Sequence, residues 1–549
     1  MITNKSNKLF QVFILILPIA FLLFFLVLPI LFTLNSSFIN INSGNFTFQN
    51  YISVLNDQLT QYFIYWTFYE SIITTIIAIF LGVGCSYILT HYNVPAKRFI
   101  RNLLTVPFLL PSITVLIGFI VVFGDNIFSS NGIILANLFY NLPLMIRLTE
   151  LGWISINPEY EVVAKSLSMS RLSYFYHVEL RHLAPSILTA SLLVFIYSFN
   201  GFAIVLVLGG IQYQTIEVRI YYLFLGIQFD EASALAIFSL LINICVVFIY
   251  LHFSSQYQTN MENYSYETKD ITKFVSKKLR MRIFRMVFFV FFSIVIFVIC
   301  IYPLLGIFQT AFIVNNKLSF KNFINLLSET IPPYGITVQD MVYNSLFFAI
   351  SVLIISIIFS LLLNFGLNYK STNNPPPVLS FQYLTNVIVI LPLMVSAITL
   401  IYSIFSLYKT TFLYENIGLI IIISDSLIAF PFANRIIATA RSNINEELLD
   451  VGKSLGLNRL KVFLKIELPL LFSSIIVAGI FSFAISMGEF ASTYFISRSN
   501  TATIPLGIYS LISIERNIPE AAALSSILIL VTLFIFYFIE RFSKFDFRI

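Results

Sequence analysis

The sequence predicts an all-α polytopic membrane protein of about twelve transmembrane helices, arranged as two tandem halves of six. Composition is the first reason: 58% of the 549 residues are hydrophobic and 11% are charged, against about 25% charged in soluble domains. The second reason is an internal repeat, in which residues 155–187 recur 288 positions later as residues 443–475. Because a soluble fold cannot bury so much apolar surface, the bilayer must be part of the solvent.

Twelve apolar stretches match the length of a membrane-spanning helix, which needs about 20 mainly apolar residues. We expect these helices near residues 10–34, 67–90, 103–124, 132–152, 185–209, 231–253, 285–312, 343–368, 381–406, 416–440, 472–495 and 520–541. A transmembrane β-barrel would show short alternating segments instead of continuous runs. The sequence therefore predicts a helical bundle in the membrane.

Basic residues predict the orientation, because Lys and Arg concentrate in cytoplasmic loops. With both termini in the cytoplasm, the 32 basic residues fall on the inner side except Arg219, Lys317, Lys321, Lys409, Arg498 and Arg516. The prediction is a multi-pass plasma-membrane protein. Its net charge of +6 is explained by these loops and by contact with anionic lipid, so we expect no nucleic-acid partner. The cysteines show no metal-binding spacing, and we expect no metal site.

The repeat divides the chain. We interpret residues 1–253 as the first half, residues 254–284 as a polar cytoplasmic linker and residues 285–549 as the second half. An even number of spans in each half places both repeats the same way up, so an axis along the membrane normal relates them. Both duplicated loops then face the cytoplasm.

Each duplicated loop carries helix signals. Asn157 and Asn445 are placed to cap a helix start, and acidic residues follow them in the first turn, where the helix dipole favours them. Ser168 and Gly456 would end or bend that helix. The pattern predicts a short helix, a turn and a second short helix, with an apolar stripe suited to a groove on another protein.

These loops resemble the EAA loops of type I ABC importer permeases. In the second loop Asp450 stands for the glutamate of that motif, Val451 and Gly452 for its alanines, Gly456 for its glycine and Pro469 for its proline. The first loop departs from the motif: Glu161 lies one position early, Ser168 replaces the glycine, and Pro185 retains a later proline. The format of one chain with two such loops is similar to the ferric-iron and thiamine branch of these permeases.

The resemblance implies two type I permease halves, an external substrate-binding protein and two cytoplasmic ABC ATPase subunits that dock on the two loops. The chain has no G-x-x-x-x-G-K-[ST] phosphate loop. We therefore expect no enzyme activity and no cofactor in this chain, with ATP used by the partner subunit. The residues that the resemblance assigns to ATPase coupling are Glu159, Glu161, Ala164, Leu167, Ser168 and Pro185, with Glu447, Asp450, Gly452, Leu455, Gly456 and Pro469.

Three polar residues within predicted spans are candidates for the substrate pathway: Asn200, Asp425 and Glu489. Placing a carboxylate in a bilayer costs about 3 kcal/mol or more, so a functional role is the default hypothesis. Two simpler explanations stay open. Glu489 lies near the outer end of its predicted helix and could be hydrated there, and Asp425 could cap a helix break.

The sequence leaves the cargo and one alternative mechanism open. Ferric iron is the first choice and thiamine the second, with phosphonates, oxyanions and sugars not excluded. A secondary transporter that works without nucleotide is the alternative class, although such carriers usually contain buried ionisable relays, for which only Asp425 and Glu489 qualify.

Overall fold

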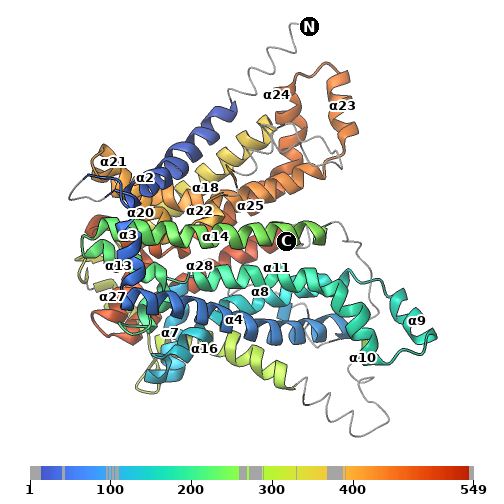
Figure 1. Cartoon of the computed structure of the whole chain (residues 1–549), viewed down its shortest axis with the longest axis horizontal. Helices are drawn as coiled ribbons and strands as arrows, with labels where there is room; N and C mark the ends of the chain where they lie inside the picture. Colours follow the sequence, from blue (N-terminus) through green and yellow to red (C-terminus); the bar gives the residue numbers. More distant parts are fainter. Residues whose placement is uncertain are drawn as a thin grey trace. The chain divides into compact units, whose positions relative to one another are not determined.

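The structure is a computed structural model that describes residues 14–39, 44–93, 97, 100–101, 104, 110–258, 269–270, 287, 290–328, 330–367, 388–389 and 391–542. Helices dominate this part of the chain (Figure 1). Strands within it are two residues long: β1 (Tyr92–Asn93) pairs with β2 (Lys269–Asp270), β3 (Ile313–Val314) with β4 (Lys317–Leu318), and β5 (Thr330–Ile331) with β6 (Ile336–Thr337). The predicted all-α polytopic fold is confirmed.

Ten helices among the described residues are long and apolar enough to cross a membrane: 14–37, 58–91, 130–154, 175–199, 229–253, 290–312, 338–366, 417–442, 459–488 and 518–535. The two remaining predicted spans, 103–124 and 381–406, lie partly outside the described residues. Their described helices are shorter, α7 (Ser112–Phe123) and α20 (Ala397–Tyr408). Pro111 directly precedes α7, and the Ser396 hydroxyl accepts a hydrogen bond from the Thr399 N–H at 3.0 Å, so each helix begins at a local signal.

Two other predicted spans, 185–209 and 472–495, are each two helices. The first consists of α11 (Leu180–Phe199) and α12 (Ala203–Leu208), and the second of α25 (Leu468–Gly488) and α26 (Ala491–Ile496). Hydropathy continues through both breaks because the residues on either side are apolar. Sequence periodicity therefore missed the breaks at Asn200 and Glu489.

The chain forms two compact units, which we call the N unit (residues 51–227 and 238–319) and the C unit (residues 1–50, 228–237 and 320–549). The N unit thus contains the first spanning helix of the second sequence repeat, and the C unit contains the first spanning helix of the first repeat. The predicted halves, 1–253 and 285–549, are defined by sequence repetition and stay a prediction, and the predicted linker, 254–284, lies largely outside the described residues.

The N unit is built around α4 (Gln58–His91), α8 (Ser130–Ile154) and α11, which pack closely on one another (Figure 1). Gly82 lies against Met145, where a Cβ would overlap the methionine side chain. The helix α16 (Tyr302–Phe312) crosses α7 where Gly118 faces the Pro303 carbonyl. Small residues at such crossings allow the backbones of membrane helices to approach. The other elements are η2 (Gly124–Ile127), α13 (Ile216–Leu225), α14 (Phe229–Gln258), whose first residues belong to the C unit, and η5 (Phe297–Ile301).

The C unit repeats this core with α18 (Val338–Gly366), α22 (Ile417–Ser442) and α25. The N-terminal helix, η1 (Leu23–Val27) followed by α2 (Leu28–Ser37), packs on α20, where the Tyr408 hydroxyl donates to the Phe24 carbonyl at 2.6 Å. The remaining elements are α3 (Gln49–Asn56), which spans the boundary of the units, α17 (Lys321–Ser328), η6 (Leu391–Met394), α21 (Phe412–Glu415), η8 (Ser499–Thr501), α27 (Ile504–Ser513) and α28 (Ile518–Phe542).

A hydrogen bond that occurs at equivalent positions of both units shows that the repeat extends to tertiary contacts. In the N unit the Ile216 N–H donates to the Thr67 hydroxyl at 3.0 Å, and in the C unit the Ile504 N–H donates to the Ser345 hydroxyl at 2.9 Å. Ile216 and Ile504 are 288 residues apart, as are the polar loops. The start of α13 is therefore fixed to α4 as the start of α27 is fixed to α18.

Candidate coupling loops and intramembrane polar site

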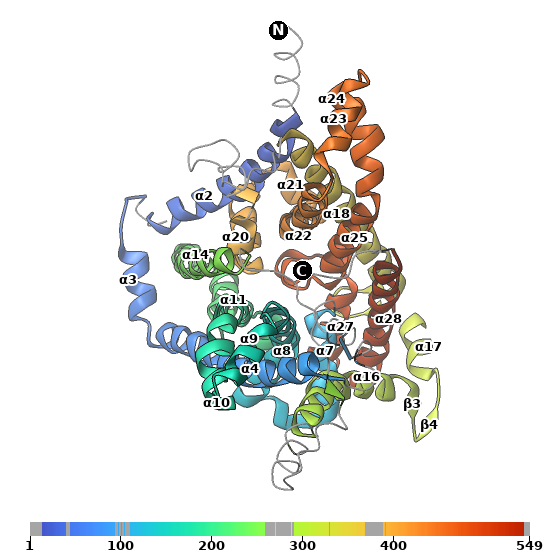
Figure 2. The same ribbon diagram turned by 90° about the vertical axis from the view of Figure 1, so that its right-hand side faces the viewer.

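Both duplicated loops fold as a helix, a turn and a second helix. The first loop contains α9 (Glu159–Ser166) and α10 (Arg171–Tyr174), and a π-helical segment, η3 (Phe175–Glu179), joins it to α11. The second contains α23 (Glu446–Ser454) and α24 (Arg459–Val462), followed by η7 (Phe463–Glu467) and α25. Figure 1 shows α23 and α24 projecting beyond the end of α25. Figure 2 shows α9 and α10 across the ends of α4, α8 and α11.

The two asparagines predicted as caps lie at matching helix starts. The Asn157 Oδ1 accepts a hydrogen bond from the Glu159 N–H at 2.9 Å, and the Asn445 Oδ1 accepts one from the Glu447 N–H at 3.0 Å. Each bond satisfies a backbone donor that a helix start leaves unpaired. The acidic residues in these first turns therefore have a structural role beside any role in docking.

The turn after each first helix has a left-handed residue at the predicted position. Ser168 has a φ of 56° and Gly456 a φ of 81°. The Met169 N–H donates to the Ala164 carbonyl at 2.9 Å, and the Leu457 N–H donates to the Gly452 carbonyl at 3.2 Å. These bonds are those of a Schellman motif, which satisfies the last carbonyls of a helix. Both loops thus have the same turn.

The apolar side chains on these turns are exposed. The exposed fraction is 69% for Leu167 and 76% for Leu455. Val162 and Val163 extend the exposed surface on α9, and Leu448 and Val451 extend it on α23. Several exposed apolar side chains on one short charged loop are typical of a surface that another protein or a membrane covers.

The other predicted coupling residues differ in exposure. Glu159, Ser168, Glu447, Asp450, Gly456 and Pro469 are exposed, Glu161 and Pro185 are partly buried, and Ala164 and Gly452 are buried. A Cβ on Gly452 would lie 2.5 Å from the Ile466 side chain, so this position allows α23 to pack on η7. Ala164 and Gly452 therefore belong to the packed underside of each loop, and a partner could reach only the opposite face.

Ion pairs to a buried carboxylate hold the base of each loop, and sequence reasoning missed them. In the first loop the Arg171 guanidinium lies 2.9 Å from the Glu179 carboxylate. In the second loop Glu467 pairs with Arg459 at the equivalent position and also with Arg441, whose Nε donates to Glu467 Oε2 at 2.9 Å. Both carboxylates are buried. The pair in the first loop and the pair of Arg459 with Glu467 are identical residues of the sequence repeat, so the repeat contained this signal.

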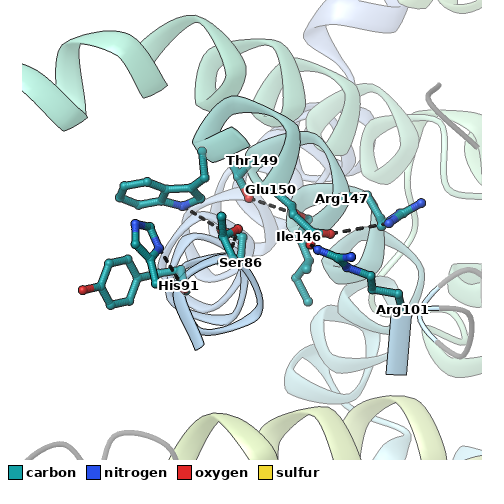
Figure 3. Close-up of polar contacts among 10 residues, drawn as sticks. Ser86, His91, Arg101, Ile146, Arg147, Thr149 and Glu150 are labelled. Atoms are coloured by element: carbon teal, nitrogen blue, oxygen red, sulfur yellow. Dashed lines mark hydrogen bonds and ion pairs between the residues drawn. The ribbon is translucent and has the colours of Figure 1, made fainter. Parts of the chain in front are cut away.

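A further ion cluster lies at the end of α8 that leads into the first loop. Arg101 and Arg147 both approach the buried Glu150 carboxylate, and the Arg147 Nη1 lies 3.4 Å from Glu150 Oε2 (Figure 3). Burial and the neighbouring Arg101 lower the pKa of Lys97, although Glu150 acts in the opposite direction. The residue equivalent to Glu150 in the second repeat is Ala438, so this cluster belongs to one unit alone.

Two of the intramembrane candidates, Asp425 and Glu489, accept hydrogen bonds from neutral donors. Asp425 accepts from the Ser486 hydroxyl at 2.8 Å and from the Ser492 hydroxyl at 2.7 Å. Glu489 accepts from the Ala491 N–H at 2.8 Å and the Ser492 N–H at 3.2 Å, so it caps the start of α26. Asp425 lies within the continuous helix α22. The capping role considered for Asp425 is therefore wrong, and Glu489 has that role.

The N unit contains a related polar site. Asn137, the residue equivalent to Asp425, donates to the buried Glu70 carboxylate at 2.5 Å. Asn200, at the break after α11, accepts from the Asn243 amide at 2.9 Å. Sequence reasoning missed Glu70, although a lone carboxylate inside an apolar span was a visible signal. Among the described residues, no group of three His, Cys, Asp or Glu side chains is placed to hold a metal ion.

Comparisons with known proteins relate this chain to membrane components of transport systems. Residues 75–258 match the family described as binding-protein-dependent transport system inner membrane component. The thiamine transport system permease protein ThiP of Haemophilus influenzae is 25% identical over 511 residues, which cover 89% of this chain and 90% of the relative. ThiP of Escherichia coli is 23% identical and covers 90% of this chain and 91% of its own length. The ferric transport system permease protein FbpB of Actinobacillus pleuropneumoniae is 25% identical over 75% of this chain and 58% of its own length.

The fold, the twin loops and these relatives define a membrane permease of the ABC importer class. The chain is a type I permease of a binding-protein-dependent ABC importer and a multi-pass inner-membrane protein. Relatives of this class are permease subunits, which are the non-enzymatic membrane components of importers.

Proposed function

We propose that each loop docks one cytoplasmic ABC ATPase subunit, so that a single chain with both termini in the cytoplasm serves two ATPase subunits. The observation that carries this proposal is the exposure of Leu167 and Leu455 on two turns of the same geometry. A groove on each ATPase subunit would cover these side chains. ATP would be hydrolysed on the partner subunits, and this chain would bind no cofactor of its own.

The coupling residues have four different roles in this proposal. Leu167 and Leu455 would enter the groove, and the flanking acidic residues Glu159, Glu447 and Asp450 would contact its rim. The buried small residues of α9 and α23 would act from beneath by keeping each helix close to the base of its loop. The left-handed residue of each turn would give the turn its shape.

An external binding protein would deliver the substrate, and thiamine is our first candidate, with ferric iron second. This order reverses the sequence-based preference. The support is that the two thiamine permeases match over about nine tenths of both chains, whereas the ferric permease matches over 58% of its own length. Asp425, Glu489 and Asn200 are proposed to line the pathway in one state of the transport cycle.

Reconstitution tests the proposal. The chain, its ATPase subunit and its binding protein are placed in vesicles, and uptake of labelled thiamine and of ferric iron is measured with ATP and with a non-hydrolysable analogue. We expect uptake of one of the two solutes that requires ATP hydrolysis. Solute movement by the chain without any ATPase subunit would instead support the secondary-transporter alternative.

A further inference from the structure

One buried guanidinium joins three helices of the C unit at the base of the second loop. Arg441 lies at the end of α22, and its Nε donates to Glu467 Oε2 at 2.9 Å, directly before α25. Its Nη1 donates to the Leu367 carbonyl at 3.0 Å, directly after α18. The exposed fraction of the side chain is 7% for Arg441 and 0% for Glu467. We call this arrangement, Arg441 with Glu467 and the Leu367 carbonyl, the arginine clamp.

The loop itself is attached to the arginine clamp. Arg459, at the start of α24, pairs with the second oxygen of Glu467, and its guanidinium lies 5.3 Å from the centre of the Phe365 ring. The planar guanidinium group holds a fixed geometry better than a flexible ammonium group does. A buried ion pair adds little net stability, but removing one partner is costly because it leaves a buried charge uncompensated. The arginine clamp therefore specifies geometry more than it adds stability.

The first loop has a different base. Trp153 occupies the position equivalent to Arg441, and its indole N–H donates to the Ser86 hydroxyl at 3.2 Å. The Trp153 ring packs against Tyr87 and His91, with centroids 5.3 Å and 4.9 Å away. At this one position, ring contacts and a neutral hydrogen bond take the place of the charged link that Arg441 makes. The ion pair of Arg171 with Glu179 is also more open to solvent than that of Arg459 with Glu467. The Arg171 side chain is 50% exposed, whereas the Arg459 side chain is 16% exposed.

We infer that Arg441 is a positioning residue that holds the second loop rigidly on the ends of three helices, while the first loop, which has Trp153 at this position, adapts to its partner. This inference rests on the proposed docking of ATPase subunits. A force on α23 passes through Arg459 and Glu467 to the ends of α22, α25 and α18. Two of these helices carry Asp425 and Ser486 of the intramembrane polar site. ATP-driven movement is therefore transmitted chiefly through the second loop.

The test uses the intact complex of the chain, its ATPase subunits and its binding protein. The variants are Arg441→Gln and Arg441→Lys, and the matched control in the first loop is Trp153→Phe. Three quantities are measured: ATPase subunit bound per chain, ATP hydrolysis, and solute moved per ATP hydrolysed. We expect Arg441→Gln to keep its ATPase subunits but to lower solute moved per ATP by about tenfold, within the usual range of coupling between sites.

The other variants are expected to rank in order. Arg441→Lys is expected to move more solute per ATP hydrolysed than Arg441→Gln but less than the unaltered chain, because it keeps the charge but not the planar set of donors. Trp153→Phe is expected to change the solute moved per ATP hydrolysed by less than about twofold, since the ring contact remains. In Arg441→Gln the Glu467 carboxylate keeps its ion pair with Arg459, so the single variant leaves no buried charge uncompensated and is expected to fold. The double variant Arg441→Gln with Glu467→Gln removes both ion pairs of Glu467 and leaves Arg459, which is 16% exposed, without this partner. We expect the double variant to remain uncoupled.

Three results would overturn the inference. They are normal coupling in the folded double variant, an equal loss of coupling in Trp153→Phe and Arg441→Gln, or loss of the ATPase subunit from folded Arg441 variants. Failure of the unaltered chain to bind any ATPase subunit would refute the proposed function itself. The two failures are therefore distinguishable in one set of preparations.

Discussion

Ser168 and Gly456 occupy the same position of two matching turns, with φ values of 56° and 81°. A left-handed conformation is nearly free of strain for glycine and costs roughly 1–2 kcal/mol for a residue with a Cβ. The first loop therefore carries a local strain that the second does not. The N–H of each residue donates back to the carbonyl of the lysine three positions before it, at 3.0 Å from Ser168 to Lys165 and at 2.9 Å from Gly456 to Lys453.

Replacing Gly456 with a bulky residue such as Trp is expected to abolish uptake while the chain still inserts in the membrane. No heavy atom lies within 4 Å of a Cβ built at this position, so the cost comes from the backbone and from a blocked docking surface. Gly456→Ala isolates the backbone cost, which is about 1 kcal/mol. Uptake and membrane content are measured together, and normal transport by Gly456→Trp would contradict the docking role.

The reciprocal change, Ser168→Gly, is expected to stabilise the first loop. Removing the Cβ from a left-handed residue relieves about 1 kcal/mol of strain. Hydrogen exchange of the backbone amides of α9 should slow in the variant. The control is Ser166→Gly, which places glycine within a helix and should speed exchange instead. Faster exchange in Ser168→Gly would show that the turn carries no such strain.

Charge at the tip of either loop is expected to weaken ATPase binding. Leu455→Asp places a carboxylate where the proposal places a buried apolar side chain, and affinity should fall about tenfold or more. Leu167→Asp should act in the same direction at the first loop. Ser454→Ala is the control, because its hydroxyl donates within the loop to the Asp450 carbonyl at 2.9 Å. Unchanged co-purification of the ATPase subunit with the doubly substituted chain would argue against both docking sites.

Two substitutions separate the charge of Glu489 from its capping role. Glu489→Gln keeps an oxygen that accepts from the Ala491 and Ser492 N–H groups, whereas Glu489→Ala removes the cap at a cost of about 1 kcal/mol. We expect both variants to lose uptake in the reconstituted importer, because the proposal places this carboxylate on the pathway. If the cap alone matters, Glu489→Gln transports normally and Glu489→Ala is less stable in detergent.

The crossing of α7 and α16 predicts a stability effect remote from the loops. A side chain at Gly118 would overlap the Pro303 carbonyl, and backbone atoms cannot move aside as a flexible side chain does. Gly118→Leu is expected to lower the free energy of unfolding by about 1–3 kcal/mol. Thermal unfolding in detergent measures the effect. Phe80→Ala, at a side chain that is 67% exposed, is the control and should have a smaller effect.

The membrane class, the positions of most spans and the two polar loops could all be predicted from the amino-acid sequence. Bilayer solvation acts on composition over about 20 residues, so hydropathy is sufficient to find the spans. Caps and turns depend on a few neighbouring residues, which explains why Asn157, Asn445, Ser168 and Gly456 could be interpreted locally. The docking role of these loops rests on the family resemblance and stays a proposal.

The pairing of polar groups, in contrast, became visible in the folded chain. Arg441 and Glu467 are 26 residues apart, and Asn137 and Glu70 are 67 residues apart; no periodicity predicts such pairs. The helix breaks after α11 and α25 lie inside continuous apolar sequence, so hydropathy could not show them. Burial makes these contacts matter, because a polar group without water must find its partner in the folded chain. That partner depends on how the helices pack, and packing is a property of the whole fold.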